Sequence, residues 1–418
     1  MNNQTLKQND FYLLVGPASL SVQSGEVEVI AAGIKAGQTL EVPSGKRVPV
    51  KAISDASLEL KAPPESFSKM ETSSIPEEWD NLAGRIASGH IMGRLYNVMV
   101  LGEVDTGKTF FCTYLANRLI EKKKRIGVLD CDTGQSDIGP PGAFGMLVMN
   151  SPTVFLSEEP ATHLYMLGAH SPGLHFLPAM TGLSYMLEKA RAGVDVLIID
   201  TTGWVQGDGG RALKKAKLDF IKPDLVVLMQ RGNELEHLVK HLPSSKVVRL
   251  PVSKKASPTS QMERKSLREL VSKRYFKNSR VFEIPFKQII TDRCYFLSGT
   301  PLPLEGTLHS ERLSGWEGTL VISSGPLLME MTKGWPKDLG RIMNFVSGHE
   351  KGLLIAFLDE NQDVLALGRL EEIDFLNNCF RVRAPFPGDL NSIKCIQFGS
   401  VKVTENGEEA GFLEPGSF

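Results

Sequence analysis

Residues 102–109, GEVDTGKT, constrain the fold more than any other part of the sequence. They fit the pattern G-x-x-x-x-G-K-[ST], and they lie between an apolar run, YNVMVLG, and a helix-like segment, FFCTYLANRLIEKKK. Glycines at these positions let backbone N–H groups wrap around phosphates, and the helix that follows presents its positive end there. A chance glycine turn would not need both neighbours, so the segment predicts a phosphate-binding loop in an α/β domain.

Each position of this loop has an expected role in binding a nucleotide. Lys108 is expected to reach the β- and γ-phosphates of ATP, and the hydroxyl of Thr109 to ligate Mg²⁺. The residues that we expect to bind ATP are Gly102, Glu103, Val104, Asp105, Thr106, Gly107, Lys108, Thr109 and Phe110. The loop therefore predicts an ATP-dependent phosphotransferase that uses Mg²⁺.

Further apolar runs indicate how the rest of the chain is organised. RIGVLDCD, VDVLIIDTTG, DLVVLM and KVVRLPV have the length of buried strands, and LSYMLEKARAG is typical of a helix. Such alternation predicts a doubly wound parallel sheet. Short apolar runs broken by turn residues precede and follow this region, and residues 63–80 resemble a linker. The predicted domains are an N-terminal β domain over 1–75, a P-loop kinase domain with a lid over 76–304, and a C-terminal β-rich domain over 305–418.

Composition limits the environment and the partners of the chain. The 418 residues carry a formal net charge of −1, so nucleic acid would have to be bound by local basic patches. The five cysteines show no CxxC spacing, which favours free thiols in a reducing compartment. The amino terminus, MNNQTLKQND, is polar, and no apolar run approaches the roughly 20 residues of a membrane span. We expect a soluble, cytoplasmic protein without a membrane partner.

Two carboxylates follow the second strand of the central region, in VLDCDTGQ. Asp130 and Asp132 are two residues apart, so on one strand they face the same side, toward the crevice that holds the phosphates. One of them can hold Mg²⁺ through water and the other can orient an attacking hydroxyl. The alternative is an ordinary turn at the end of a strand.

A tryptophan stands in the glycine-rich segment IIDTTGWVQGDGG, residues 198–210. Trp204 is well placed to stack on a nucleobase, although packing on the sheet edge is the alternative. The D-x-x-G in this segment resembles a GTPase switch, but no guanine-reading N-K-x-D motif follows, which disfavours a GTPase.

Residues 246–280 are strongly basic, with eleven Lys or Arg against two Glu. Within them, ERKSLRELVSKRYF looks helical and places Arg264 and Arg268 one turn apart on one face. Phosphotransferases often close such arginines over the transferring phosphoryl group. The alternative is a solvated basic surface.

Together these motifs resemble the polynucleotide 5′-hydroxyl kinase family. This family includes the kinase subunit of the eukaryotic pre-mRNA cleavage and polyadenylation machinery, a pre-rRNA-processing relative and archaeal RNA kinases. The resemblance spans nearly the whole chain, and its motifs are LLVGPASLSVQSGEVEV, GEVDTGKT, DCDTGQ, GAHSPGLH, DTTGWVQGDG, ERKSLRELVSKRYF and LLIAFLDENQDVLALGRLEEID.

The resemblance implies roles for individual residues. Asp132 would be the general base and a metal-side residue, whereas the family tolerates Glu at Asp130 and Asn at Asp200. Arg264 and Arg268 would be the lid arginines. The substrate-binding residues would be Gln135, Ser171, Thr202, Gly203 and Trp204. One departure is Glu103, which stands where the family usually has proline.

The most specific prediction is transfer of the ATP γ-phosphate to the 5′-hydroxyl end of RNA, DNA or both, with no protein partner specified. One alternative is an ATP-bound scaffold of an RNA-processing complex that has lost catalysis. Another is a kinase for a small metabolite. Lys108, Thr109, Asp132 and the lid arginines favour an active enzyme, because a scaffold has no reason to keep an acceptor-side base.

Overall fold

Two compact units make up the computed structural model, which describes residues 2–89, 93–253, 260–315 and 317–414. Each unit is assembled from three stretches of the chain. The first contains Met1–Asp130, Met146–Thr162 and Leu187–Pro258, and the second contains Cys131–Gly145, His163–Met186 and Thr259–Phe418. The division into three consecutive domains stays a prediction.

The N-terminal part of the first unit consists of two small antiparallel sheets. Its strands are β1 (Asn2–Leu6), β2 (Phe11–Val15), β3 (Ala18–Ser24), β4 (Glu26–Val29), β5 (Ala32–Lys35), β6 (Thr39–Val42), β7 (Arg47–Ala52), β8 (Ala56–Lys61) and β9 (Phe67–Met70). The strand orders are β1-β8-β3-β6 and β5-β4-β7-β2-β9. The linker prediction for residues 63–80 is wrong, because β9 pairs with β2 and Trp79 is buried in the following helix.

The rest of the first unit carries the central sheet. Its helices and strands are α1 (Glu77–Gly89), β10 (Tyr96–Gly102), α2 (Lys108–Glu121), β11 (Ile126–Asp130), β14 (Val196–Asp200), α4 (Gly207–Ile221), β15 (Leu225–Gln230), α5 (Glu236–Val239) and β16 (Val247–Pro251). Two further elements, β12 (Ala143–Met149) and α3 (Phe176–Gly193), have residues in both units. Short 3₁₀ turns cover Pro64–Ser66, Leu156–Glu158 and Ser244–Lys246.

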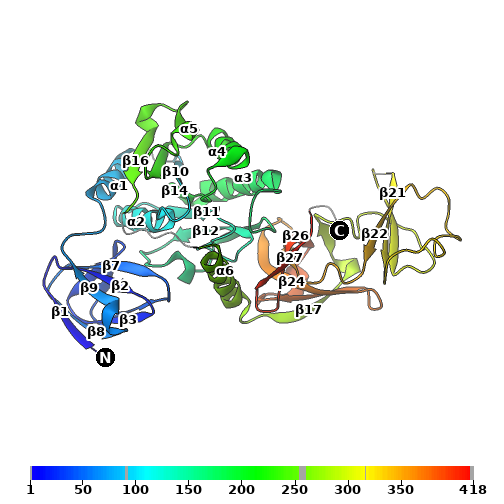
Figure 1. The fold of residues 1–418 in the computed structure, drawn as a ribbon, viewed down its shortest axis with the longest axis horizontal. Coiled ribbons are helices and arrows are strands. Elements are labelled where there is room, and N and C mark those ends of the chain that lie inside the picture. Colours follow the sequence, from blue (N-terminus) through cyan, green and yellow to red (C-terminus); the bar gives the residue numbers. More distant parts are fainter. Residues whose placement is uncertain (1, 90–92, 254–259, 316, 415–418) are drawn as a thin grey trace. The chain divides into compact units, whose positions relative to one another are not determined.

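Parallel pairing in the order β11-β14-β10-β15-β16 confirms the predicted doubly wound sheet. The chain leaves β10 through α2, and α2 lies against β10, β11 and β14 while α1 packs on α2 (Figure 1). Strands β11, β14 and β15 are buried along their whole length, as expected for a sheet covered on both faces. The carboxyl ends of the strands therefore meet at one edge, beside the phosphate-binding loop.

The second unit is mostly β structure with one long helix. Its elements are β13 (His163–Met166), α6 (Gln261–Phe276), β17 (Arg280–Pro285), β18 (Ile290–Asp292), β19 (Thr300–Pro301), β20 (His309–Leu313), β21 (Gly318–Ser323), β22 (Arg341–Val346), β23 (Leu353–Leu358), β24 (Val364–Asp374), β25 (Cys379–Ala384), β26 (Cys395–Val403) and β27 (Glu409–Phe412), with 3₁₀ turns at Phe286–Gln288 and Leu390–Ser392. One sheet has the order β17-β25-β24-β23-β26-β18, with β27 added to β26, and a second has the order β19-β20-β21-β22. Phenylalanines 282, 296, 357 and 380 are prominent in its core.

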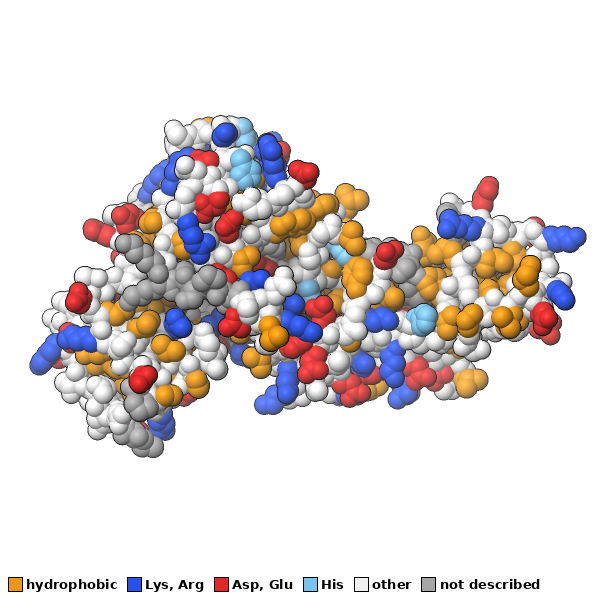
Figure 2. Space-filling model, in the orientation of Figure 1, with side chains coloured by type: hydrophobic (Ala, Val, Ile, Leu, Met, Phe, Trp, Pro, Cys, Tyr) orange, Lys and Arg blue, Asp and Glu red, His pale blue; other side chains and the backbone are white. Residues whose placement is uncertain are grey.

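Charged side chains of both signs are interspersed over the face shown in Figure 2, as the near-zero net charge leads one to expect. No helix in the described ranges has the length and apolar character needed to cross a membrane.

Candidate active site

The phosphate-binding loop joins the end of β10 to the start of α2. Asp105 and Gly107 adopt left-handed backbone conformations, with φ of 60° and 83°. A Cβ at Gly102 would lie 2.4 Å from the hydroxyl of Thr106 and 3.0 Å from the carbonyl oxygen of Met229. The loop is thus wound too tightly for a larger residue at this position, which is the geometry that directs backbone N–H groups toward a phosphate.

Lys108 and Thr109 open α2 and face the end of the sheet. Lys108 is buried, and its Nζ donates to the carbonyl oxygen of Glu103 at 2.8 Å, so the cation lies across the loop. The hydroxyl of Thr109 donates to Oδ2 of Asp200 at 2.6 Å. Asp200 ends β14 and is in register with Asp130 at the end of β11. Two buried carboxylates therefore stand beside the loop.

These carboxylates act electrostatically on a neighbouring cysteine. Burial, and then the charges of Asp200 and Asp130, raise the pKa of the Cys112 thiol well above its ordinary value. A negative region next to a threonine hydroxyl suits a divalent cation. The family resemblance implied no essential role for Asp200, and its contact with Thr109 depends on a strand register that the local sequence does not reveal.

The clasp loop, residues 201–206, packs directly on the phosphate-binding loop. A Cβ at Gly203 would lie 2.5 Å from a methyl group of Val104 and 2.6 Å from its backbone nitrogen, so glycine permits the close approach. Nε2 of Gln206 donates to Oε1 of Glu103 at 2.9 Å. Glu103, the departure from the family pattern, therefore links the two loops.

Thr202 is fixed by a lysine that sequence reasoning missed. Lys214 of α4 is completely buried, and its Nζ donates to the carbonyl oxygen and to the hydroxyl of Thr202 at 2.6 and 3.0 Å. The hydroxyl of Thr202 is thus engaged within the protein. A signal was present, because Lys214 and Lys217 fall on the same helical stripe as the buried Leu213 and Leu218.

Two aromatic residues among the predicted sites are partly buried. Trp204 lies over the start of α4, where a Cβ at Gly210 would come within 3.0 to 3.1 Å of the indole. The indole is neither fully core nor fully exposed, so its stacking role stays a prediction. The ring of Phe110 lies 5.9 Å from that of Trp79 in α1, which makes packing its visible contact.

Arg231 is a second residue that the sequence did not single out. It follows β15, and its Nη2 donates to the carbonyl oxygen of Asp105 in the phosphate-binding loop at 3.2 Å. The carboxylate of Glu234 accepts from the backbone N–H groups of Arg231 and Gly232, at 2.6 and 2.8 Å, which fixes the turn that carries it.

Several predicted acceptor-side residues belong to the second unit. Oδ1 of Asp132 accepts from the backbone N–H groups of Gly134 and Gln135, both at 3.1 Å, which orients the carboxylate. A Cβ at Gly134 would lie 2.9 Å from the carbonyl oxygen of His170, so this turn packs against the residue preceding Ser171. Ser171 is exposed. Asp132, Gln135 and Ser171 thus come from two neighbouring turns.

The helix predicted over residues 263–276 is confirmed as α6, whereas its role as a lid stays a prediction. Ser260 and Glu263 form a capping box at its start, and Arg264 and Arg268 are half-buried in a first half that is largely exposed. Nη2 of Arg268 lies 3.3 Å from Oε2 of Glu409. The basic residues Lys254 and Lys255 of the same predicted segment lie outside the described residues.

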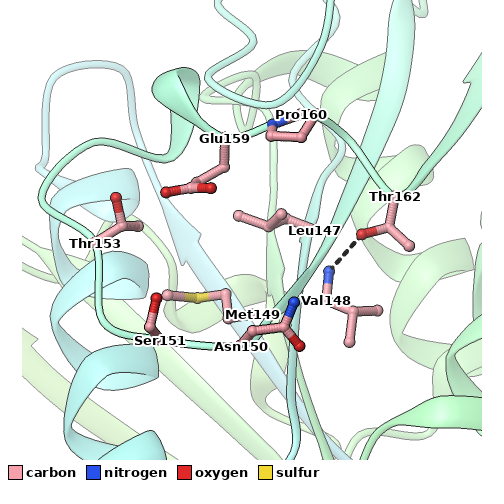
Figure 3. A pocket seen from close by; sticks show the side chains of 9 residues that line it. All are labelled: Leu147, Val148, Met149, Asn150, Ser151, Thr153, Glu159, Pro160 and Thr162. Carbon is pink, nitrogen blue, oxygen red and sulfur yellow. Dashed lines mark hydrogen bonds between the residues drawn. The ribbon is translucent and has the colours of Figure 1, made fainter.

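A surface pocket in the first unit is not lined by any of the predicted site residues. Figure 3 shows it at the end of β12 and the loop that follows, where the hydroxyl of Thr162 accepts from the backbone N–H of Val148 at 2.9 Å. Its lining residues are Leu147, Val148, Met149, Asn150, Ser151, Thr153, Glu159, Pro160 and Thr162. None of the predicted site residues lines it, so the chemistry is assigned to the loops described above.

The tight glycine loop, the parallel sheet and the Lys108 and Thr109 side chains define a P-loop nucleotide-binding protein. The family described as "mRNA cleavage and polyadenylation factor CLP1 P-loop" matches residues 102–278. The chain is 32% identical over 358 residues to a polyribonucleotide 5′-hydroxyl-kinase of Pyrococcus horikoshii, covering 82% of this chain and 95% of the relative. A second such kinase, from Methanocaldococcus jannaschii, is 29% identical over 324 residues, which cover 76% of this chain and 90% of the relative.

The chain belongs to the polyribonucleotide 5′-hydroxyl-kinase family. Its fold is also that of Clp1p in the structure of the wild-type Clp1p–Pcf11p complex, with a TM-score of 0.67 and coverage of 96% of this chain and 97% of the other. The sequence identity between the two is 11%, so this likeness concerns the fold alone.

Proposed function

We propose that this protein transfers the γ-phosphate of ATP to the 5′-hydroxyl end of a polynucleotide, with RNA as the favoured acceptor. The observation that carries the proposal is the buried Lys108 beside the Thr109–Asp200 pair, in a chain that covers 95% of a kinase of this name. RNA is favoured because the archaeal relatives are named polyribonucleotide kinases.

The donor side is built from residues of the first unit. The loop from Gly102 to Thr109 would hold the phosphates of ATP through its backbone N–H groups, and Lys108 would move from the Glu103 carbonyl to the β- and γ-phosphates. The hydroxyl of Thr109 and the carboxylate of Asp200, already 2.6 Å apart, offer oxygen ligands of the kind that Mg²⁺ prefers. When bound, Mg²⁺ neutralises charge on these phosphates.

The acceptor side is proposed from the residues that the family resemblance assigns to it. Asp132, which the family resemblance assigns as base and metal-side residue, would take the proton of the 5′-hydroxyl. The 5′-oxygen then bonds to the γ-phosphorus, the bond from that phosphorus to the β,γ-bridging oxygen breaks, and ADP leaves. Arg264 would stabilise charge on the phosphoryl oxygens, and Trp204 would stack on a terminal base. Positioning and electrostatics supply most of the rate, since the transition state is loose.

The test incubates the purified protein with γ-labelled ATP, Mg²⁺ and 5′-hydroxyl RNA, beside DNA of the same sequence. Oligomers that already carry a 5′-phosphate are the acceptor controls, and Lys108→Ala is the protein control. We expect label on 5′-hydroxyl oligomers only, and none with Lys108→Ala. ATP binding without transfer to any 5′-hydroxyl oligomer would instead favour the scaffold alternative.

A further inference from the structure

A carboxylate near the C-terminus of the second unit joins two residues from distant parts of the chain. Oε2 of Glu409, on β27, accepts from Nδ1 of His170 at 3.0 Å and lies 3.3 Å from Nη2 of Arg268 on α6. The side chains of His170 and Arg268 are 13% and 20% exposed, whereas that of Glu409 is 40% exposed. Two sheltered donors therefore converge on one oxygen of a more accessible anion.

The segment that carries His170 is held in place without help from Glu409. The carbonyl oxygen of Gly168 accepts from the backbone N–H groups of Ser400 and Val401, at 2.8 and 3.0 Å. Nε2 of His175 lies 3.0 Å from the hydroxyl of Ser400. The segment is thus fastened to β26 on both sides of His170.

The helix that carries Arg268 has its own anchors as well. The hydroxyl of Tyr275 accepts from the backbone N–H of Leu367 at 2.8 Å. A Cβ at Gly407 would lie 2.4 Å from the Cβ of Ser272, so the last turns of α6 press on the turn before β27. His170 and Arg268 would therefore keep their places if the carboxylate left.

Glu409 itself is placed where it can move at low cost. All four residues of β27 are exposed, and the strand pairs with β26 alone among the described strands. The ladder is irregular beside Val403, the residue that pairs with Glu409. The hydrogen bond from His170 is the largest cause that lowers the pKa of Glu409 to about 2, so the carboxylate is ionised near neutral pH. The Glu409 carboxylate therefore binds His170 and Arg268 as a singly charged anion with two oxygens.

A phosphodiester has the same charge and likewise presents two terminal oxygens. His170 directly precedes Ser171, which is assigned to the acceptor, and Arg268 is one turn from Arg264, which is assigned to the transferring phosphoryl group. We propose that His170 and Arg268 bind a backbone phosphodiester of the polynucleotide acceptor, and that Glu409 fills this site until the phosphodiester displaces it. This inference rests on the proposed function, because it concerns the substrate of that reaction.

Whether Glu409→Gln tightens or weakens RNA binding distinguishes a carboxylate that competes with RNA from one that only supports the structure. Glu409→Gln keeps the size of the side chain and removes the competing charge, so we expect 5′-hydroxyl RNA to bind about three- to tenfold more tightly. His170→Ala should weaken binding in both backgrounds. Glu408→Gln, an equal change of charge at the neighbouring exposed residue, should leave binding unchanged. Weaker or equal RNA binding by Glu409→Gln would overturn the inference.

Chemical substitution in the RNA tests the same point with a folded, unaltered protein. Binding is measured by fluorescence anisotropy without ATP, using oligomers in which one phosphodiester near the 5′ end is a neutral methylphosphonate. One such position should weaken binding to wild-type protein and abolish the gain given by Glu409→Gln. If no position does so, the phosphodiester site is wrong.

Turnover measured in parallel distinguishes failure of this inference from failure of the proposed function. Label transfer by wild-type protein, with no tighter RNA binding by Glu409→Gln, would remove the inference and leave the kinase assignment intact. Tighter binding without label transfer by either protein would support the phosphodiester site and contradict the kinase assignment.

Discussion

Replacing Lys214 by methionine tests whether a buried ammonium holds the clasp loop against the phosphate-binding loop. Methionine fills a similar volume but leaves the carbonyl oxygen and hydroxyl of Thr202 without the donations at 2.6 and 3.0 Å. Hydrogen bonds from charged groups contribute roughly 1.5–3 kcal/mol each. Removing a buried charge also removes its desolvation cost, which offsets part of that loss. We expect the free energy of unfolding to fall by about 1.5–3 kcal/mol.

The same substitution should affect catalysis beyond its effect on folding. Gly203 contacts Val104 of the phosphate-binding loop, so a loosened Thr202 should misplace Trp204 and lower the rate of label transfer per folded molecule. Urea denaturation gives the stability, and transfer to 5′-hydroxyl RNA at saturating ATP gives the rate. Lys215→Met, at the next and less buried residue of α4, is the matched control. A Lys214→Met protein with wild-type stability and wild-type transfer would refute the reasoning.

Three further predictions concern residues of the proposed site. Lys108→Ala should abolish label transfer while leaving the protein folded, because the cation expected on the β- and γ-phosphates is lost; near wild-type turnover would exclude this role. Asp132→Asn should lower the transfer rate by roughly 10²–10⁴-fold through loss of the base. Asp200→Asn should cost much less, since an amide oxygen can still accept from Thr109, and the opposite order of rates would move the base to Asp200. Trp204→Ala should weaken oligomer binding by about 1–3 kcal/mol with little change in basal ATP hydrolysis. Arg264→Ala should instead lower the maximal rate at saturating oligomer. If Trp204→Ala lowers only the melting temperature and Arg264→Ala is fully active, the acceptor assignments are wrong.

The central sheet could be predicted because each of its strands is recognisable from consecutive residues of the sequence. Strands such as β11 and β15 are continuous apolar runs, and they are buried on both faces. The edge strands β1 and β9 could not be predicted in this way. β1 has the polar sequence NNQTL and exists because it pairs with β8, while β9 lies in a run rich in Pro, Ser and Glu and exists because it pairs with β2.

The same distinction between local and long-range features applies to the site. The phosphate-binding loop and α6 follow from consecutive residues, so spacing alone identified them. The pairing of Thr109 with Asp200, 91 residues away, depends on the register of β14 in the sheet. The contact between Arg268 and Glu409 spans 141 residues and depends on the edge strand β27, whose four exposed residues carry no apolar pattern. Long-range contacts of this kind cannot be predicted from a short stretch of sequence.

Transfer to a chemically defined acceptor tests the kinase assignment most directly. Three RNA oligomers of one sequence would be offered with γ-labelled ATP and Mg²⁺: one with a 5′-hydroxyl, one with a 5′-phosphate, and one whose terminal 5′ carbon carries hydrogen in place of the hydroxyl. We expect label on the first oligomer alone, one ADP released per label transferred, and neither product with Lys108→Ala. ADP release without labelled RNA, or equal labelling of the oligomer that lacks the 5′-hydroxyl, would contradict a polynucleotide 5′-hydroxyl kinase.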